Sequence, residues 1–132
     1  MVPMETFEGF PIRSGFFGPD WELEDCVAGA RRNPGTFRVP SPEEEALVSI
    51  GTLLRLHFIV TDPAAGDDAP RAERMWVEVC ALPRAGIHRG HLTNEPRFIR
   101  SLQPGDVIEF TWAHVAQVYV RAQDPRHPFA GA

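Results

Sequence analysis

The sequence predicts an α+β fold in which N-terminal helices pack on a small, strongly bent antiparallel β-sheet. The pattern is compatible with a sheet that closes into a barrel and with one that does not. Apolar residues recur at helical spacing between residues 20 and 50, and the period changes to 2 after Gly51. About five short strands then follow, separated by turn residues. A chain of 132 residues has the length of one domain, so we take residues 1–132 as a single domain.

The first fifty residues divide into a phenylalanine-rich tail, residues 1–19, and a helical part, residues 20–50. We expect the tail to lie across the core, because four aromatic rings are costly to leave in water: Phe7, Phe10, Phe16 and Phe17. In the helical part, apolar residues at i, i+3, i+4 and i+7 predict a helix capped by Asp20 and stopped at Asn33-Pro34-Gly35: Leu23, Cys26, Val27 and Ala30.

A second, shorter helix is predicted after residue 40. Ser41 stands at the capping position, Pro42 at the first helical position and Glu44 at the third, which is the pattern of a capping box. We expect this helix to end at about Ser49.

Residues 51–120 are predicted to form the β-sheet part, and residues 121–132 a frayed C-terminus. Alternating apolar residues predict half-buried strands, with a hairpin at Pro83–Gly86 between the second and third of them. The predicted strands are Leu53–Val60, Glu73–Leu82, Ile87–Thr93, Asp106–Trp112 and Val115–Val120.

Charge is distributed unevenly along the chain. Residues 1–50 hold nine acids and four arginines, residues 51–132 hold nine of each, and the net charge is -5. This balance argues against a general nucleic-acid binder and fits a basic protein partner, which would contact the acidic cluster Glu22, Glu24 and Asp25. The same cluster also suits the first turn of the predicted helix.

The sequence lacks certain patterns, and this predicts both the cellular location of the protein and the state of its cysteines. No apolar run reaches the roughly 20 residues of a membrane span, and the start MVPMETFEGF lacks the pattern of a signal peptide, so we expect a cytoplasmic protein. Cys26 and Cys80 have no CxxC spacing and are expected to be buried free thiols.

Three motifs carry a resemblance to a known family. The strand ERMWVEV (73–79), the turn GHLTNEP (90–96) and the step LQPGD (102–106) resemble the YegJ-like family of small bacterial proteins, a domain of unknown function. The resemblance covers about residues 20–118 and carries no established reaction. It implies that the turn residues are markers of the family: Gly90, Asn94, Glu95 and Pro96.

Several residues are candidates for a site. Four arginines near that turn predict a belt that binds an anion: Arg84, Arg89, Arg97 and Arg100. Trp76 is a candidate contact anchor if the phenylalanine-rich tail does not cover its face. No metal or other cofactor is expected, because His88 and His91 should point to opposite faces of one strand.

The sequence therefore leaves three functional hypotheses, in this order. The first is a non-catalytic protein-binding domain, such as a toxin-neutralising immunity protein. The second is a small-barrel module that binds an anionic ligand or nucleic acid through the arginine belt. The third is an enzyme built around Glu95 and His91.

Overall fold

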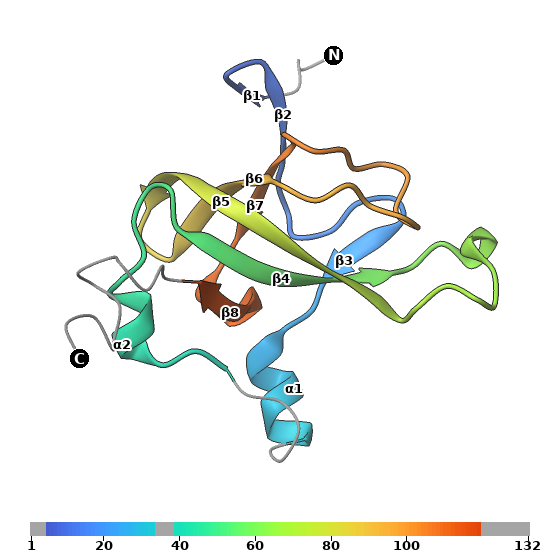
Figure 1. Ribbon diagram of the computed structural model, residues 1–132, viewed down its shortest axis with the longest axis horizontal. Helices are drawn as coiled ribbons and strands as arrows, with labels where there is room; N and C mark the ends of the chain where they lie inside the picture. The colour runs from blue at the N-terminus through green and yellow to red at the C-terminus, as the bar shows by residue number, and fades with distance from the viewer. Residues whose placement is uncertain (1–4, 34–38, 120–132) are drawn as a thin grey trace.

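The computed structural model describes residues 5–33 and 39–119, which form one strongly curled sheet (Figure 1). Seven strands follow one another across it in the order β1-β2-β7-β6-β5-β4-β3, and β8 pairs with β4 beside β3. The strands are β1 (Thr6–Phe7), β2 (Phe10–Arg13), β3 (Trp21–Leu23), β4 (Leu53–Val60), β5 (Ala72–Arg84), β6 (Ile87–Leu92), β7 (Val107–Phe110) and β8 (Val115–Tyr119).

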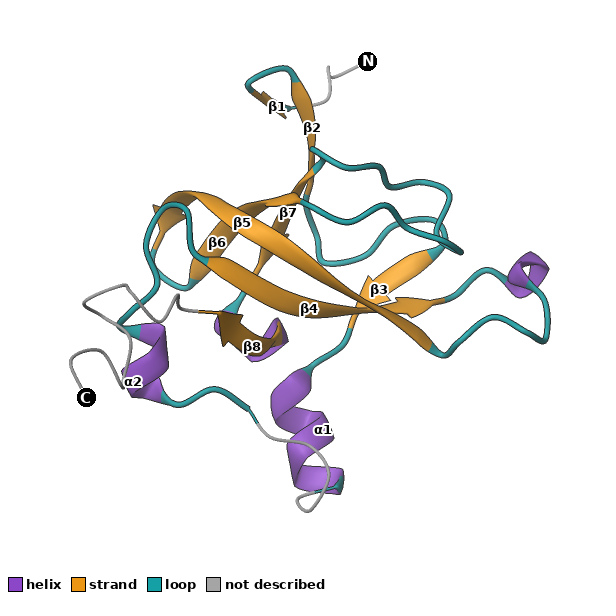
Figure 2. Ribbon diagram, in the orientation of Figure 1, coloured by secondary structure: helices purple, strands orange, loops and turns teal. Residues whose placement is uncertain are grey.

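The predicted architecture of helices packed on an antiparallel sheet is wrong. The described residues hold two short α-helices, α1 (Cys26–Arg32) and α2 (Pro42–Glu45), and neither covers a face of the sheet (Figure 2). The sheet is mixed, because β2 runs parallel to β7. It curls into a half-barrel and encloses the core between its own strands, so it does not need a layer of helices to bury its apolar face.

The helix predicted from Asp20 begins five residues later than expected. Trp21 and Leu23 are buried and Glu22 is exposed, which is the alternation of a strand, and β3 pairs with the end of β4. Helix α1 then starts at Cys26, where the side chain of Asp25 accepts a hydrogen bond from the Ala28 amide at 3.0 Å. The predicted stop includes residues 34 and 35, which lie outside the described part of the chain.

The capping box of α2 is confirmed. The Glu44 amide donates to Ser41 Oγ at 3.2 Å, and the Ser41 amide donates to Glu44 Oε1 at 3.3 Å. The helix ends at Glu45 instead of Ser49, because the amides of Leu47 and Val48 bond three residues back and tighten the chain into a turn.

The predicted strands of the second half are present, and several of them begin or end one or two residues away from the predicted bounds. The inner faces of β4 and β5 carry the expected apolar residues, and the β5–β6 hairpin turns at Ala85 and Gly86, where Gly86 has a φ of 81°. Strand β7 ends at Phe110, and Trp112 opens the 3₁₀ turn η2 (Trp112–His114). A second 3₁₀ turn, η1 (Pro63–Ala65), lies between β4 and β5. The C-terminus predicted to be frayed, 121–132, lies outside the described residues.

The described part of the phenylalanine-rich tail lies mainly along one edge of the sheet. Strand β2 pairs with β7, and the rings of Phe7 and Phe10 contact His91 on β6. Phe16 packs against the margin of the core, while Phe17 is 67% exposed. The tail therefore extends the sheet and leaves the outer side of β4 and β5 uncovered.

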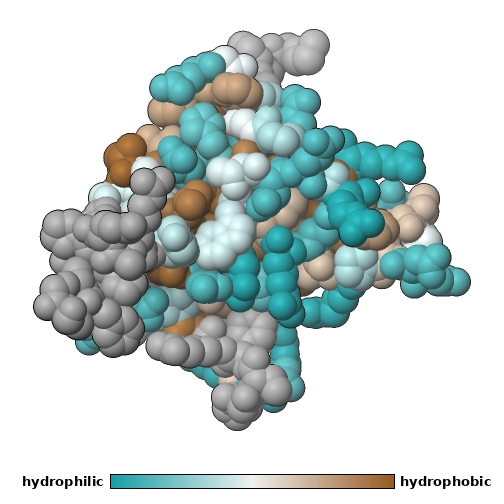
Figure 3. Space-filling view, in the orientation of Figure 1, coloured by the Kyte–Doolittle hydropathy of each residue, from teal (hydrophilic) through white to brown (hydrophobic). Residues whose placement is uncertain are grey.

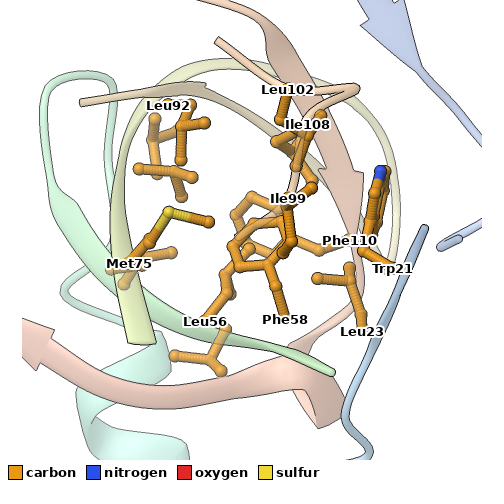
Figure 4. Close-up of a cluster of buried hydrophobic side chains, with 14 residues drawn as sticks. Trp21, Leu23, Leu56, Phe58, Met75, Leu92, Ile99, Leu102, Ile108 and Phe110 are labelled. Carbon is orange, nitrogen blue, oxygen red and sulfur yellow. The ribbon is translucent and has the colours of Figure 1, made fainter. Parts of the chain in front are cut away.

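The loop between β6 and β7, residues 93–106, folds back over the curled sheet and contributes two residues to its core. Ile99 is 2% exposed and Leu102 is 5% exposed, and Figure 4 shows Ile99 among the labelled side chains from β4 and β7. The backbone of this loop has no strand partner over most of its length, so its amides, several of them partly buried, need other acceptors.

Three carboxylates supply those acceptors. Glu73 accepts from the amides of residues 97, 98 and 99 at 2.7, 3.1 and 3.0 Å. Asp20 accepts from the amides of residues 100 and 101 at 2.7 and 3.2 Å, and from the Ser101 hydroxyl. Asp106 accepts from the Gln103 amide at 3.2 Å and from Arg13 at 3.3 Å. We call these three residues the carboxylate clamp.

The clamp predicts that Asp20→Asn lowers the free energy of unfolding by about 2–3 kcal/mol, because charged acceptors form the stronger hydrogen bonds and the amide group brings a donor against other donors. Urea unfolding measures this change. Glu95→Gln is the matched control on the loop itself, since Glu95 is exposed and makes no hydrogen bond among the described residues, and it should stay within about 0.5 kcal/mol of wild type. Equal losses in the two variants would contradict the clamp.

Candidate functional site

The predicted acidic cluster does not form one free patch. Glu24 is 5% exposed, and its carboxylate accepts from Arg71 at 2.8 Å and contacts His57 Nδ1 at 3.3 Å. Asp25 caps α1, and Glu22 alone of the three is an exposed carboxylate without such a role. Two of the three acids therefore serve the fold.

In the Glu24–His57 contact the carboxylate is the acceptor and the imidazole the donor. A carboxylate only accepts, so the proton of the ring lies on Nδ1. Burial raises the pKa of Glu24, but the hydrogen bonds from Arg71 and His57 outweigh burial and hold that pKa below its usual value. Burial lowers the pKa of His57, and the hydrogen bond to Glu24 only partly offsets this. Both directions agree with a charged Glu24 beside an uncharged His57.

Trp76 lies on the outer side of β5, on a face that the described tail leaves open. Its ring meets the ring of Tyr119 edge to face, with 6.3 Å between the centroids, and Tyr119 is 50% exposed. Arg55 on β4 lies opposite Trp76 in the β4–β5 register and opposite Gln117 in the β4–β8 register, and Arg74 is the next outward residue on β5. We call this surface the outer face and define it as Arg55, Arg74, Trp76, Gln117 and Tyr119.

The two arginines of the outer face are not ion-paired within the part of the chain that the structure describes. Neither Arg55 nor Arg74 makes an ion pair within 4.0 Å in the described part of the chain, and Arg55 Nε is buried without a hydrogen-bond partner there. Burial lowers the pKa of Arg55, and the charge of Arg74 lowers it further. The face thus holds two mutually repelling guanidiniums beside two aromatic rings, an arrangement that an incoming anionic group stabilises.

A groove adjoins the outer face. It has a volume of about 390 Å³ and includes Arg55 in its lining. The rest of the lining comes from β8, from α2 and from the two residues that precede Ser41: Ala116, Gln117, Val118, Glu44, Val39 and Pro40. Figure 3 shows hydrophilic side chains running across the front of β4 and β5, with paler surface between them.

The turn that resembles the YegJ-like family has a structural role. Asn94 Oδ1 accepts from the Trp76 amide at 2.6 Å, and the Thr93 hydroxyl donates to the Trp76 carbonyl at 2.9 Å. A Cβ at Gly90 would lie 2.8 Å from Val77 Cγ2, so only glycine fits there without a shift. Glu95 is exposed and Pro96 half-buried. The turn therefore holds the backbone of β5 at Trp76 through hydrogen bonds to its amide and its carbonyl.

The four arginines of the predicted belt are not brought together. Arg84 lies at the β5–β6 hairpin, whereas Arg97 and Arg100 lie in the loop at the other end of β6. Between them, Arg89 is bonded to Glu109 at 2.8 Å and lies 3.7 Å from Glu5. The structure does place Arg55 and Arg74 close together, on neighbouring strands. In the sequence, the only indication of this is that each arginine alternates with core residues and so faces outward from its strand.

The described residues hold no group of three or more potential metal ligands. His88 is buried on the inner face of β6 and His91 faces outward, as the spacing predicted. Burial raises the pKa of the Cys26 thiol to about 12 and also raises the pKa of Cys80, so neither is poised to act as a thiolate.

The chain matches no protein-family model, no curated protein and no solved structure. Among the described residues, no helix is both long enough and apolar enough to span a membrane.

Three buried or half-buried histidines predict the response of stability to acid. Burial lowers the pKa values of His57, His88 and His114, so the unfolded chain binds protons at higher pH than the folded protein does. The free energy of unfolding should fall as pH drops below about 6.5, by up to about 1.4 kcal/mol per histidine and pH unit. Urea unfolding between pH 7.5 and 5 measures this, with each histidine titrated by NMR; a flat profile over that range would contradict it.

Proposed function

We propose that the protein is a non-catalytic protein-binding domain and that its partner docks on the outer face. The observation that carries the proposal is the pair of the half-buried Trp76 and the exposed Tyr119, flanked by two arginines that make no ion pair with a described residue, on a side of the sheet that the described tail does not cover. Tryptophan, tyrosine and arginine are the residues that contribute most to binding energy in protein interfaces. Such a domain acts by occupying its partner, as a toxin-neutralising immunity protein does.

The charge of the outer face favours a partner that presents acidic side chains. Arg55 and Arg74 each offer a planar fork of donors that matches a carboxylate. The net charge of -5 favours a basic partner, but in the predicted acidic cluster Glu24 is already bonded to Arg71 inside the protein and Asp25 caps α1. The unpaired arginines therefore outweigh the net charge in choosing the partner.

Binding of nucleic acid through the arginine belt has less support. Its arginines lie at both ends of β6, and Arg89 is already paired with Glu109. A phosphate backbone requires cations that follow its path along one surface.

Site-specific photo-crosslinking in cells tests the proposal. A benzoylphenylalanine in place of Trp76 or Tyr119 should form a covalent adduct with one protein, because both rings lie in the contact surface. The purified partner, identified by mass spectrometry, should then bind the Arg55→Gln/Arg74→Gln double variant at least about tenfold more weakly than wild type, with a shallower dependence on salt.

Two matched controls accompany this experiment. Benzoylphenylalanine at Phe17, an exposed aromatic position that is not among the five residues of the outer face, should give no adduct with that protein. Arg97→Gln, which removes an exposed arginine of the β6–β7 loop, should leave the affinity unchanged. Absence of an adduct at position 76, or equal affinities of the double variant and wild type, would refute the proposal.

A further inference from the structure

A second cavity lies where β5 and β6 meet the segment that follows α2. It has a volume of about 250 Å³. Three titratable side chains line it, Glu45, Arg84 and His88, and the rest of the wall is Val48, Leu82, Ala85, Gly86 and Ile87. Its size suits a ligand much smaller than a drug. None of these residues belongs to the outer face, so this pocket is separate from the proposed protein-binding surface.

His88 is the polar group at the inner side of this pocket. It is 8% exposed and stacks on Phe110, with 5.4 Å between the ring centroids and an interplanar angle of 16°. Its Nδ1 is buried and has no hydrogen-bond partner in the described part of the chain. An orphaned N–H is rarer in proteins than an orphaned acceptor, so the neutral ring keeps its proton on Nε2, the nitrogen left for a ligand.

Two opposite charges lie at the rim of the same pocket. Glu45 from the end of α2 and Arg84 from the end of β5 are both exposed, and no ion pair within 4.0 Å joins either of them to a described residue. Because the two charges do not neutralise each other, both are available to groups on a ligand.

The apolar side of the pocket is open to solvent. Leu82 is 49% exposed although it is a large aliphatic residue on a strand, and Val48 and Ile87 are half-buried beside it. An aliphatic group placed against these three side chains would remove apolar surface from water.

We propose that this pocket binds a small aliphatic α-amino acid. Arg84 and His88 Nε2 would donate to its carboxylate, Glu45 would accept from its ammonium group, and Val48, Leu82 and Ile87 would hold its side chain. A zwitterion accounts for both rim charges, whereas a simple fatty acid leaves Glu45 unmatched and a simple amine leaves Arg84 unmatched.

Titration of the whole chain with three probes of one shape tests the proposal. L-leucine, 4-methylpentanoate and isopentylamine share the same branched aliphatic group and differ in their charged groups. Leucine should shift the imidazole NMR signals of His88 saturably at concentrations up to about 10 mM, the range expected for a weakly held small ligand. Each of the other two probes should bind at least about tenfold more weakly, because it lacks one charged group.

Variants of the exposed rim keep the test independent of folding. Arg84→Gln and Glu45→Gln should each weaken leucine binding about tenfold or more, while the matched variants Arg97→Gln and Glu95→Gln, at the opposite end of β6, should not. Leucine that leaves the His88 signals unchanged would overturn the proposal. So would equal binding of 4-methylpentanoate, or leucine binding that is unaltered in both rim variants.

Discussion

The architecture depends on three carboxylates that accept hydrogen bonds from the backbone of one loop. Residues 93–106 make few hydrogen bonds with strands, yet they place Ile99 and Leu102 in the core. An amide that leaves water without gaining an acceptor costs about 1–3 kcal/mol, so unbonded amides in this partly buried loop would oppose its place over the core. The carboxylate clamp removes that cost, and it ties together β5, the start of β3 and the start of β7.

The same use of acidic groups explains the character of the surface. Asp20, Glu24 and Asp106 are buried and bonded, and Glu73 and Glu109 also spend their carboxylates on partners within the protein. Arg55 and Arg74 have no such partners among the described residues and remain on the outer face. Net charge therefore describes this protein poorly, because several acids are bonded inside the protein while Arg55 and Arg74 lie on the outer face without an ion pair among the described residues.

The sequence correctly predicts those features of the fold that depend on interactions between residues close together in the chain. The period of 2 in β4 and β5 and the capping box of α2 involve residues at most a few positions apart, and both are present. The stretch from Trp21 to Ala30 misled the prediction, because its apolar spacing fits a helix throughout, and only pairing with β4 makes residues 21–23 extended. The parallel pairing of β2 with β7 joins residues about 95 positions apart and leaves no local signal.

The candidate sites were harder to predict for the same reason. Trp76 was found because a single outward tryptophan on an alternating strand is visible in sequence. Its neighbours Arg55 and Tyr119 required knowledge of which strands lie side by side. The arginine belt grouped residues that are close in sequence, but β6 holds its ends apart and Glu109 neutralises the arginine between them.

Irregularities in β5 explain how one strand serves two different surfaces. Up to Val79 the strand alternates regularly, with Met75 and Val77 inward and Trp76 outward. Its register with β6 then shifts twice, between Val79 and Ala81 and again between Ala81 and Arg84. Such shifts bend a strand and redirect its side chains, so the last part of β5 leaves the core and exposes Leu82. Trp76 therefore lies before these bulges and Leu82 after them, so the same strand contributes its regular part to the outer face and its bent part to the pocket beside His88.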